Sequence, residues 1–433
     1  MEKLNIPLYQ RLYEDIKYKI RRNEYKKNTK LESIRSLAKK LDISTTTVEK
    51  AYNQLLIEGY ITSIPRSGYV VLAVDLLEKS FHKPLVDPII AHTYPNDKLT
   101  SDLFDIKSYK AIVNKVLNYD SEKLFTECDP RGEEELREEI RKYVLSERDV
   151  QCDINQIIIG AGIQNLLHIL LNISEKKSVT YLTPEFKKAT KVFKSYGYTL
   201  KPRKSIKEIS RIKADYLYIS PSNIYPTGEV IKVKERNEII KWSKQNDSFI
   251  IEDDYNFFLR FNSYTVPSIH SYNNGENVIY MGSFSKTFLP SMRLSFMILP
   301  VPLYNIYKEN YSEFSQGVSK LEQLTLARYM KEGCFRRHTK KLYNLYKEKN
   351  EAITSSLIRQ NKNKNFKIRG NDSNLHVILD FKTKYFLDTF KRNCNRYDLK
   401  FEVINGSNSV IFPYSGIETK NIKRLIKDLF YNM

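Results

Sequence analysis

Apolar residues near the start of the chain recur with the spacing of an amphipathic helix. The first stripe consists of residues four positions apart: Leu8, Leu12, Ile16 and Ile20. Positions with this spacing fall on one face of an α-helix, so the pattern predicts a first helix with one buried side. A second, shorter helix is predicted after Ser33, and it carries the apolar residues Ile34, Leu37, Ala38 and Leu41.

A third helix is predicted after the turn at Asp42-Ile43, because Ser44 is a favoured N-cap residue. Its inward face consists of residues at i, i+3, i+4, i+7 and i+8: Val48, Ala51, Tyr52, Leu55 and Leu56. The side chains left outward or at its beginning are Thr45, Thr46, Thr47, Lys50 and Asn53. Gly59 ends this helix, and residues 60–62 and 69–71 predict two strands of a hairpin around the turn Pro65-Arg66-Ser67-Gly68.

Helix, turn, helix and hairpin wing match a DNA-binding geometry in which the second helix of the pair enters the major groove. Hydroxyl groups at the beginning of that helix suit phosphates or base edges, and Arg66 on the wing suits the minor groove or the backbone. The alternative is a small helical domain that binds another protein. Charge favours the first interpretation, because residues 1–73 hold 14 Lys and Arg against 8 Asp and Glu.

The head resembles the GntR-type winged helix over its whole length. The motifs that carry the resemblance are Pro7-Leu8-Tyr9, Leu31-Glu32-Ser33-Ile34-Arg35-Ser36-Leu37-Ala38, Ser44-Thr45-Thr46-Thr47-Val48, Ala51-Tyr52, Leu55 and Glu58-Gly59. The resemblance implies a DNA-binding domain over 1–73 that contacts a double-stranded operator through Arg35, Ser44, Thr45, Thr46, Thr47, Lys50, Arg66, Ser67 and Gly68. Family members usually carry arginine at the position of Thr45, so the base contacts there differ from the family pattern.

Residues 74–105 contain three prolines and no sustained period, which predicts a linker. In the body that follows, over 106–433, strand-like and helix-like runs alternate, and this favours an α/β architecture. Three runs are short and almost continuously apolar, as buried parallel strands are: 216–219, 249–251 and 278–281. Polar residues follow each run directly, and functional groups in open α/β sheets lie at such strand ends.

Lys286 lies in the segment after the third run, within Gly282-Ser283-Phe284-Ser285-Lys286, and Arg293 follows seven positions later. A lysine amine here can meet an aldehyde while serines and an arginine hold a phosphate, which is the layout of an enzyme that binds pyridoxal phosphate (PLP) as a Schiff base. Asp253 and Tyr255 follow the second run and supply a carboxylate for the pyridine nitrogen and a phenol for the ring hydroxyl. A solvated acidic strand end and a surface lysine are the alternatives for each residue taken alone.

The order of these motifs resembles the fold-type I aminotransferases, which have large and small subdomains. With the head attached, nearly the whole chain resembles the MocR-type regulators, in which a GntR-type head is fused to an aminotransferase-like body. The resemblance implies that Lys286 forms the Schiff base, that Asp253 and Tyr255 bind the ring, and that Ser283 and Arg293 hold the phosphate. It further implies phosphate contacts from the backbone at Gly162-Ile163-Gln164 and ring stacking by Phe186, for which ordinary core packing is the alternative.

The chain departs from the family pattern at several positions. Tyr225 replaces the asparagine that aminotransferases carry before Pro-Thr-Gly, and Glu127 replaces a tyrosine that reaches the phosphate from the partner subunit. The segment 408–415 lacks the arginine that binds the substrate α-carboxylate in the family's aminotransferases. Serine or asparagine cannot replace bidentate capture by arginine. Arg369 and Arg396 are candidates to substitute for it from elsewhere in the fold.

The combination predicts a transcription regulator, and not an enzyme, whose body senses PLP or a PLP–amine adduct. Because the carboxylate arginine is missing, the first predicted target is a set of vitamin B6 genes, and the second is amino-acid or 4-aminobutyrate use. The competing hypothesis is a working PLP-dependent aminotransferase. We expect a homodimer that binds repeated half-sites. The sequence has no signal-peptide pattern, membrane-length apolar run, or metal spacing among its four cysteines, so we expect a cytoplasmic protein without a metal site.

Overall fold

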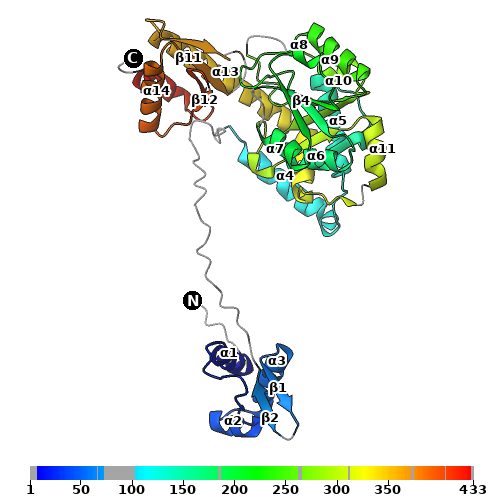
Figure 1. Ribbon diagram of the computed structural model, residues 1–433, viewed down its shortest axis with the longest axis vertical. Helices are drawn as coiled ribbons and strands as arrows, with labels where there is room; N and C mark the ends of the chain where they lie inside the picture. Colours follow the sequence, from blue (N-terminus) through cyan, green and yellow to red (C-terminus); the bar gives the residue numbers. More distant parts are fainter. Residues whose placement is uncertain are drawn as a thin grey trace. The chain divides into compact units, whose positions relative to one another are not determined.

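The computed structural model describes residues 7–65, 67–72, 103–183, 187–261, 266–310, 313–370, 372, 375–404 and 406–430. The chain divides into two compact units, Met1–Ala91 and His92–Met433. Figure 1 shows the winged head in blue and the larger body in cyan to red. The expected boundaries at 73/74 and 105/106 stay predictions, since residues 73–102 lie outside the described ranges.

The head contains three helices and a two-stranded antiparallel hairpin. Its elements are α1 (Leu8–Arg21), α2 (Ile34–Leu41), α3 (Thr45–Ile57), β1 (Ile61–Ile64) and β2 (Gly68–Val71). Ser33 and Ser44 cap α2 and α3, because their hydroxyls accept hydrogen bonds from the backbone N–H of Ser36 and Thr47. The predicted inward face of α3 is correct: Val48, Ala51 and Leu55 are fully buried in the core of the head, and Tyr52 almost so.

The body begins with α4 (Ile106–Tyr119) and is organised around a seven-stranded mixed sheet in the order β3-β9-β8-β7-β6-β4-β5. The strands are β3 (Ile157–Gly160), β4 (Ser178–Leu182), β5 (Thr199–Arg203), β6 (Tyr216–Ile219), β7 (Phe249–Asp253), β8 (Val278–Ser283) and β9 (Ser295–Ile298). Neighbours from β8 to β5 are parallel, whereas β9 is antiparallel to both β3 and β8. The three apolar runs form β6, β7 and β8, which confirms the prediction of buried parallel strands, and the structure shows that they are neighbours in the sheet.

Helices cover both faces of this sheet (Figure 1). Ile158 packs with α6 (Ile163–Asn172), α7 (Lys187–Ser195) and α11 (Val301–Asn310), whereas its neighbours Ile157 and Ile159 pack with α4, α5 (Glu134–Arg148) and α12 (Lys320–Lys331). Alternate residues of a strand point to opposite faces, so a strand covered on both sides must be apolar at every position. The remaining elements of the large subdomain are η2 (Ser121–Phe125), η3 (Ile154–Gln156), α8 (Ile206–Ile209), α9 (Val233–Gln245), α10 (Ile269–Tyr272) and η4 (Pro290–Met292).

A smaller subdomain follows the long helix α13 (Cys334–Gln360). Its antiparallel sheet has the order β10-β11-β13-β12, from β10 (Phe366–Arg369), β11 (His376–Phe381), β12 (Glu402–Ile404) and β13 (Ser409–Pro413). Two helices, α14 (Lys384–Arg396) and α15 (Thr419–Leu429), pack on it. The beginning of α13 packs in the core of the large subdomain and its end in the core of the small one. The expected large and small subdomains are therefore present.

A buried ion pair ties α5 to the strand ends of the large sheet. Arg148 Nε lies 2.6 Å from Asp254 Oδ2, and their side chains are 1% and 0% exposed. The same guanidinium donates to Ser222 Oγ at 2.8 Å and to the Val266 carbonyl at 2.7 Å. Tyr280 OH donates to Asp254 Oδ2 at 2.7 Å. These bonds satisfy a carboxylate and a guanidinium that would otherwise be costly to bury.

We expect Arg148→Ala to lower the free energy of unfolding of the body by about 3–5 kcal/mol, because it leaves Asp254 buried without its cationic partner. Arg141→Ala is the matched control on the same helix, since Arg141 forms a half-exposed pair with Glu138 one turn away. That variant should change the stability by less than about 0.5 kcal/mol. Urea unfolding measures both, and equal losses would show that the buried pair is not a stability determinant.

Candidate functional site

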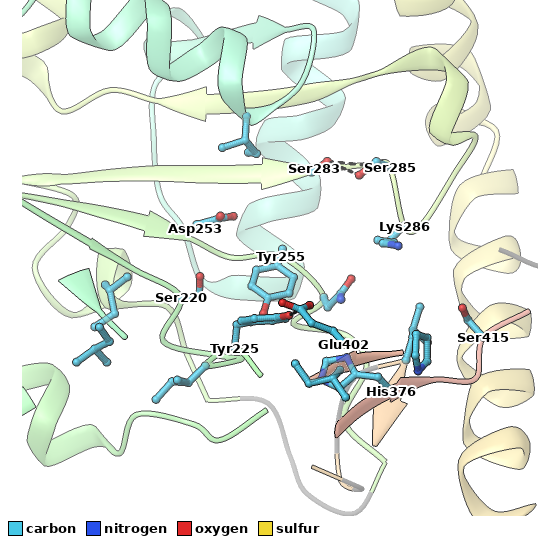
Figure 2. Close-up of a pocket in the computed structure, with 18 of the residues that line it drawn as sticks. Ser220, Tyr225, Asp253, Tyr255, Ser283, Ser285, Lys286, His376, Glu402 and Ser415 are labelled. Carbon is cyan, nitrogen blue, oxygen red and sulfur yellow. Dashed lines mark hydrogen bonds between the residues drawn. The ribbon is translucent and has the colours of Figure 1, made fainter. Parts of the chain in front are cut away.

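A cavity of about 420 Å³ opens at the strand ends of the large sheet. The large subdomain contributes residues at the ends of β6, β7 and β8 or just after them, including Ser220, Asp253, Tyr255, Ser283 and Lys286. The small subdomain closes the other side with Leu375, His376, Lys400, Phe401, Glu402, Ile411, Pro413 and Ser415. Figure 2 shows Lys286 facing into this space between Ser285 and the small-subdomain residues. Parallel strands end at one edge of the sheet, and this is why three distant motifs meet here.

Asp253 and Tyr255 present unused hydrogen-bonding capacity. Tyr218 OH donates to Asp253 Oδ2, whereas Asp253 Oδ1 and Tyr255 OH are buried and have no hydrogen-bond partner among the residues that the structure describes. Burial raises the pKa of Asp253 to about 6; the Tyr218 hydrogen bond opposes this shift and the charge of Asp254 adds to it. Burial likewise raises the pKa of Tyr255, so its phenol stays protonated at neutral pH. Buried polar atoms without partners are uncommon and point to a bound group that the chain alone does not supply.

A cradle for an anion lies at the N-terminus of α6. Gly162 caps this helix with φ of +96°, and the first backbone N–H groups of a helix, here those of Ile163 and Gln164, have no acceptor within the helix. A Cβ at Gly162 would lie 2.5 Å from Arg293 Nη2, so only glycine lets the guanidinium approach the helix end. Ser283 Oγ lies 2.9 Å from Ser285 Oγ and accepts a hydrogen bond from Ser295 Oγ at 3.0 Å. Guanidinium, hydroxyl and amide donors together suit a phosphate.

Two further buried arginines hold the loop that follows β6. Arg236 is fully buried and donates to the carbonyls of Pro221 and Pro267 at 3.0 and 2.6 Å. Arg260 donates to the Ser222 carbonyl at 3.0 Å and to Asp372 Oδ2 at 3.0 Å. The two guanidinium groups therefore hold the backbone of this loop, which carries Tyr225 at the cavity.

Tyr225 and the following proline contact the small subdomain directly. Tyr225 OH donates to Glu402 Oε2 at 2.9 Å, and His376 Nε2 lies 2.7 Å from the Pro226 carbonyl oxygen. The rings of Tyr225 and His376 have an edge contact with centroids 6.1 Å apart. The sequence flagged Tyr225 only as a departure from asparagine, and the structure places it on the cavity wall.

The segment 408–415 contributes Ile411, Pro413 and Ser415 to the cavity and no cation. Arg369 pairs with Asp380 at 2.5 and 2.9 Å, and neither it nor Arg396 is among the described lining residues. Glu127 is also not among them; its carbonyl accepts from Lys320 Nζ at 2.8 Å. The two arginines considered as substitutes therefore do not supply a carboxylate site within this chain's cavity.

Several cavity residues were missed by sequence analysis. Tyr218 lies within the apolar strand β6, so the sequence pattern did not indicate that its phenol would contribute a polar contact to the site. The only hint was that the strand beside it ends at Asp253. His376, Lys400 and Glu402 belong to the small subdomain and are far from any motif. No periodicity connects them to the large sheet, because their positions depend on how the two subdomains pack.

Most of the predicted DNA-binding residues lie on exposed parts of the head. The exposed residues are Arg35, Ser44, Thr45, Thr46 and Lys50, and Thr47 is half-buried. Ser67 lies in the hairpin turn, and Gly68 begins β2 directly after it. The Ser44 hydroxyl lies within hydrogen-bond distance of the hydroxyls of Thr46 and Thr47, at 2.9 and 2.7 Å. Lys30, which the sequence analysis did not consider, pairs with Val70 at the wing. Arg66 and Phe186 lie outside the described residues.

The described residues fit PLP better than a metal ion. They contain no group of three or more His, Cys, Asp or Glu side chains that could hold a metal. The partnerless Asp253 Oδ1 and Tyr255 OH suit the pyridine nitrogen and the ring hydroxyl, and the Gly162 cradle suits the phosphate. Lys286 shares the same cavity.

In the parts of the chain that the structure describes, no helix is long and apolar enough to cross a membrane.

We expect Gly162→Ala to weaken PLP binding at least tenfold, because the new methyl group displaces Arg293 and a charged hydrogen bond contributes about 1.5–3 kcal/mol. Gly197→Ala is the matched control: Gly197 has φ of +74°, but a Cβ at this position would meet no atom within 4 Å. It imposes similar backbone strain without the clash. Calorimetric titration with PLP distinguishes the two, and equal affinities would contradict the assignment of the cradle.

The raised pKa of Asp253 predicts a pH-dependent stability of the ligand-free protein. An acid whose pKa is higher in the folded than in the unfolded state stabilises the fold at low pH, and this contribution is lost as the pH rises through about 6. Asp253→Asn removes the titration. Between pH 5 and pH 7 the parent should therefore lose about 1 kcal/mol more stability than the variant. Parallel urea unfolding curves at both pH values provide the measurement, and identical pH dependence would show that Asp253 is ionised throughout.

Comparison with known proteins matches the two parts of the chain to two families. Residues 8–71 match the family described as "Bacterial regulatory proteins, gntR family", and residues 101–389 match "Aminotransferase class I and II". The fold of the body is similar to that of LysN, an α-aminoadipate aminotransferase from Thermus thermophilus. That structure has a TM-score of 0.67 and 19% identity, and the match covers 77% of this chain and 89% of LysN.

Relatives that match most of the chain are named as regulators. The uncharacterized HTH-type transcriptional regulator YdeL of Bacillus subtilis (strain 168) is 34% identical, with 98% of this chain and 96% of YdeL covered. The probable rhizopine catabolism regulatory protein MocR of Rhizobium meliloti is 24% identical, with 98% and 93% covered. The pyridoxine biosynthesis transcriptional regulator PdxR of Corynebacterium glutamicum is 25% identical, with 81% and 78% covered. The chain therefore belongs to the MocR-type DNA-binding regulators, in which a GntR-family head is fused to an aminotransferase class I and II body.

Proposed function

We propose that this regulator senses PLP, alone or together with an amine, through Lys286 and thereby changes how its head binds DNA. The observation that carries the proposal is that Lys286 shares a cavity with Asp253 and Tyr255, and that Asp253 Oδ1 and Tyr255 OH have no hydrogen-bond partner among the described residues. Each buried polar atom without a partner costs folding free energy, so a body that bound no ligand would gain nothing from keeping these atoms available.

The residues have distinct roles in holding the cofactor. Asp253 accepts from the pyridine nitrogen, Tyr255 donates to the ring hydroxyl, and Arg293 with the N-terminus of α6 holds the phosphate. PLP supplies an aldehyde that can bond covalently to a primary amine. Lys286 offers that amine from the segment after β8. Ionised Asp253 would gain a cationic partner in the ring, which offsets the cost of its burial.

An aromatic cluster offers a route from this cavity to the segment that leads toward the head. Phe104, at the beginning of the described body, packs against Phe288 with ring centroids 5.4 Å apart, and against His338 at the same distance. Phe288 is two residues beyond Lys286 and is 4% exposed. A displacement of the Lys286 segment would therefore move Phe104, since closely packed rings cannot shift independently. Because Phe104 belongs to the last residues of the predicted linker 74–105, the change can reach DNA binding.

The genes that we propose as targets are those of vitamin B6 synthesis or salvage. Two observations support this choice: PdxR is named for pyridoxine biosynthesis, and no arginine is among the described residues of the cavity that could hold an α-carboxylate. Regulation of amino-acid or 4-aminobutyrate use is the second candidate. An active aminotransferase is the third, and it is favoured only by the fold of the body. We further propose a homodimer that binds repeated half-sites, in keeping with the assemblies of fold-type I proteins.

We expect a visible absorbance band when PLP is added to the purified protein, and no such band with Lys286→Ala. In the parent, PLP should change the affinity for operator DNA by about 5- to 150-fold, the usual range of coupling between two sites. The variant should bind the same DNA with an affinity that PLP leaves unchanged. Electrophoretic mobility shift or fluorescence anisotropy measures both affinities.

Two further variants separate sensing from transmission and from DNA binding. Lys50→Ala, on the exposed side of α3, should weaken DNA binding while leaving the absorbance band intact. Phe104→Leu should keep both the band and DNA binding but reduce the response of DNA binding to PLP. Full PLP control of DNA binding in Lys286→Ala would refute the proposed function. Sustained turnover of an amino donor with a keto acid would instead favour the enzyme.

A further inference from the structure

Hydrogen-bond acceptors gather at the end of the cavity away from the phosphate cradle. Figure 2 shows Glu402, Tyr225 and His376 together on the side of the cavity opposite Ser283 and Ser285. Glu402 Oε2 accepts from Tyr225 OH at 2.9 Å. Oε1 forms an ion pair with Lys187 Nζ at 3.8 Å, which is beyond hydrogen-bond length, and the side chains of Glu402 and Lys187 are 54% and 73% exposed. The carboxylate thus keeps the capacity to accept a further strong hydrogen bond.

The two neighbours of Glu402 add acceptors and not donors. A carbonyl oxygen only accepts, so the contact between His376 Nε2 and the Pro226 carbonyl places the proton on Nε2. Burial lowers the pKa of His376, which favours the neutral ring and leaves Nδ1 as an acceptor. Burial raises the pKa of Tyr225, and Glu402 raises it further, so the phenol donates to Glu402 and retains a lone pair.

The remaining walls at this end are apolar or already engaged. Ile224, Leu375, Phe401 and Ile411 line the cavity here. Lys400 also lines it but has an interaction of its own. No arginine is among the described lining residues. A ligand tail in this space therefore meets apolar side chains, the carboxylate of Glu402 and the ammonium of Lys400, which already has an interaction within the chain.

We propose that this acceptor group, Glu402 with Tyr225 and His376, binds the distal ammonium group of an aliphatic diamine. The inference rests on the proposed function, in which the cavity also holds PLP, and it names the class of amine that is sensed. An ammonium group has three donors and no acceptor, which matches a carboxylate, a phenol lone pair and a neutral imidazole nitrogen. The methylene chain would lie against the apolar walls.

The same geometry disfavours the two nearest relatives of a diamine. A monoamine of equal length would place a methyl group beside Glu402 and leave the carboxylate without a new partner. An ω-amino acid would place a second carboxylate beside Glu402, and like charges repel at this distance. Charge-assisted hydrogen bonds contribute more than neutral ones, so the terminal group decides the preference.

The test is calorimetric titration of the PLP-loaded protein with 1,4-diaminobutane, 1-aminobutane and 4-aminobutyrate, which share a four-carbon chain and differ at its end. Diamines of three and five carbons extend the series. We expect a diamine to bind about two- to fivefold more tightly than the monoamine of its length, since an ion pair with a half-exposed carboxylate contributes up to about 1 kcal/mol. We expect 4-aminobutyrate to bind more weakly than either.

Glu402→Gln should abolish the preference for the diamine and leave the affinity for 1-aminobutane unchanged. Glu276→Gln is the matched control, because Glu276 pairs with Lys244 and does not line the cavity. It removes the same charge and should leave all affinities unchanged. Tighter binding of 4-aminobutyrate, or an unaltered diamine preference in Glu402→Gln, would overturn the inference.

The absorbance spectrum keeps this inference distinct from the function on which it rests. If PLP produces a Lys286-dependent band but no diamine binds preferentially, the proposed sensor stands and the diamine assignment is wrong. If no band appears with PLP, the proposed function itself fails, and the amine site fails with it. DNA affinity with PLP, with and without the diamine, then reports whether the bound amine is read by the head.

Discussion

The pleat of β7 and the ion pair beneath it determine how the cavity is built. Successive residues of a strand point to opposite faces, so Asp253 faces the cavity with Tyr218 while Asp254 points to the other side. There Asp254 meets Arg148, which also holds Ser222 in the loop after β6. One guanidinium therefore fixes the ends of two adjacent strands. Because both charges are fully buried, neither partner can be lost without leaving the other unpaired.

The arginines in the body act mainly as structural donors, which explains how the chain can be basic and still leave its cavity without a guanidinium at the small-subdomain end. Arg236 and Arg260 bind backbone carbonyls of the loop 221–228, and Arg369 pairs with an aspartate of its own sheet. Arg293, in contrast, meets the N-terminus of α6 beside the cavity. The guanidinium thus lies at the phosphate end, whereas the small-subdomain end holds the acceptors Glu402 and His376 together with Lys400.

This asymmetry separates the two tasks of a regulator of this kind. The phosphate cradle and the ring-binding residues come from the large subdomain, whereas the proposed amine site requires Glu402 and His376 of the small one. A ligand that spans both would report on how the subdomains are packed. Phe104 and Phe288 connect that packing to the beginning of the body. A working transaminase would need a carboxylate anchor, and the segment 408–415 contributes Ile411, Pro413 and Ser415 to the described cavity and no arginine.

Local signals in the sequence were sufficient for the elements and for one half of the site. Ser33 and Ser44 announced α2 and α3, because capping depends on residues within one helical turn. The apolar runs predicted β6, β7 and β8. The proximity of Asp253, Tyr255 and Lys286 followed from the rule that parallel strands end at one edge of the sheet. The roles of Arg66 and Phe186 and the domain boundaries stay predictions.

The sequence by itself thus determined the two domains, the α/β class and the large-subdomain wall of the cavity, since these depend on spacing along the chain. Only the tertiary structure decided that His376, Lys400 and Glu402 line the same cavity as Lys286. It also decided that Arg148 pairs with Asp254 and that Arg369 pairs with Asp380 outside the described cavity lining. Such pairs join residues more than a hundred positions apart or on different subdomains. Their proximity results from long-range packing, which leaves no periodic trace in the sequence.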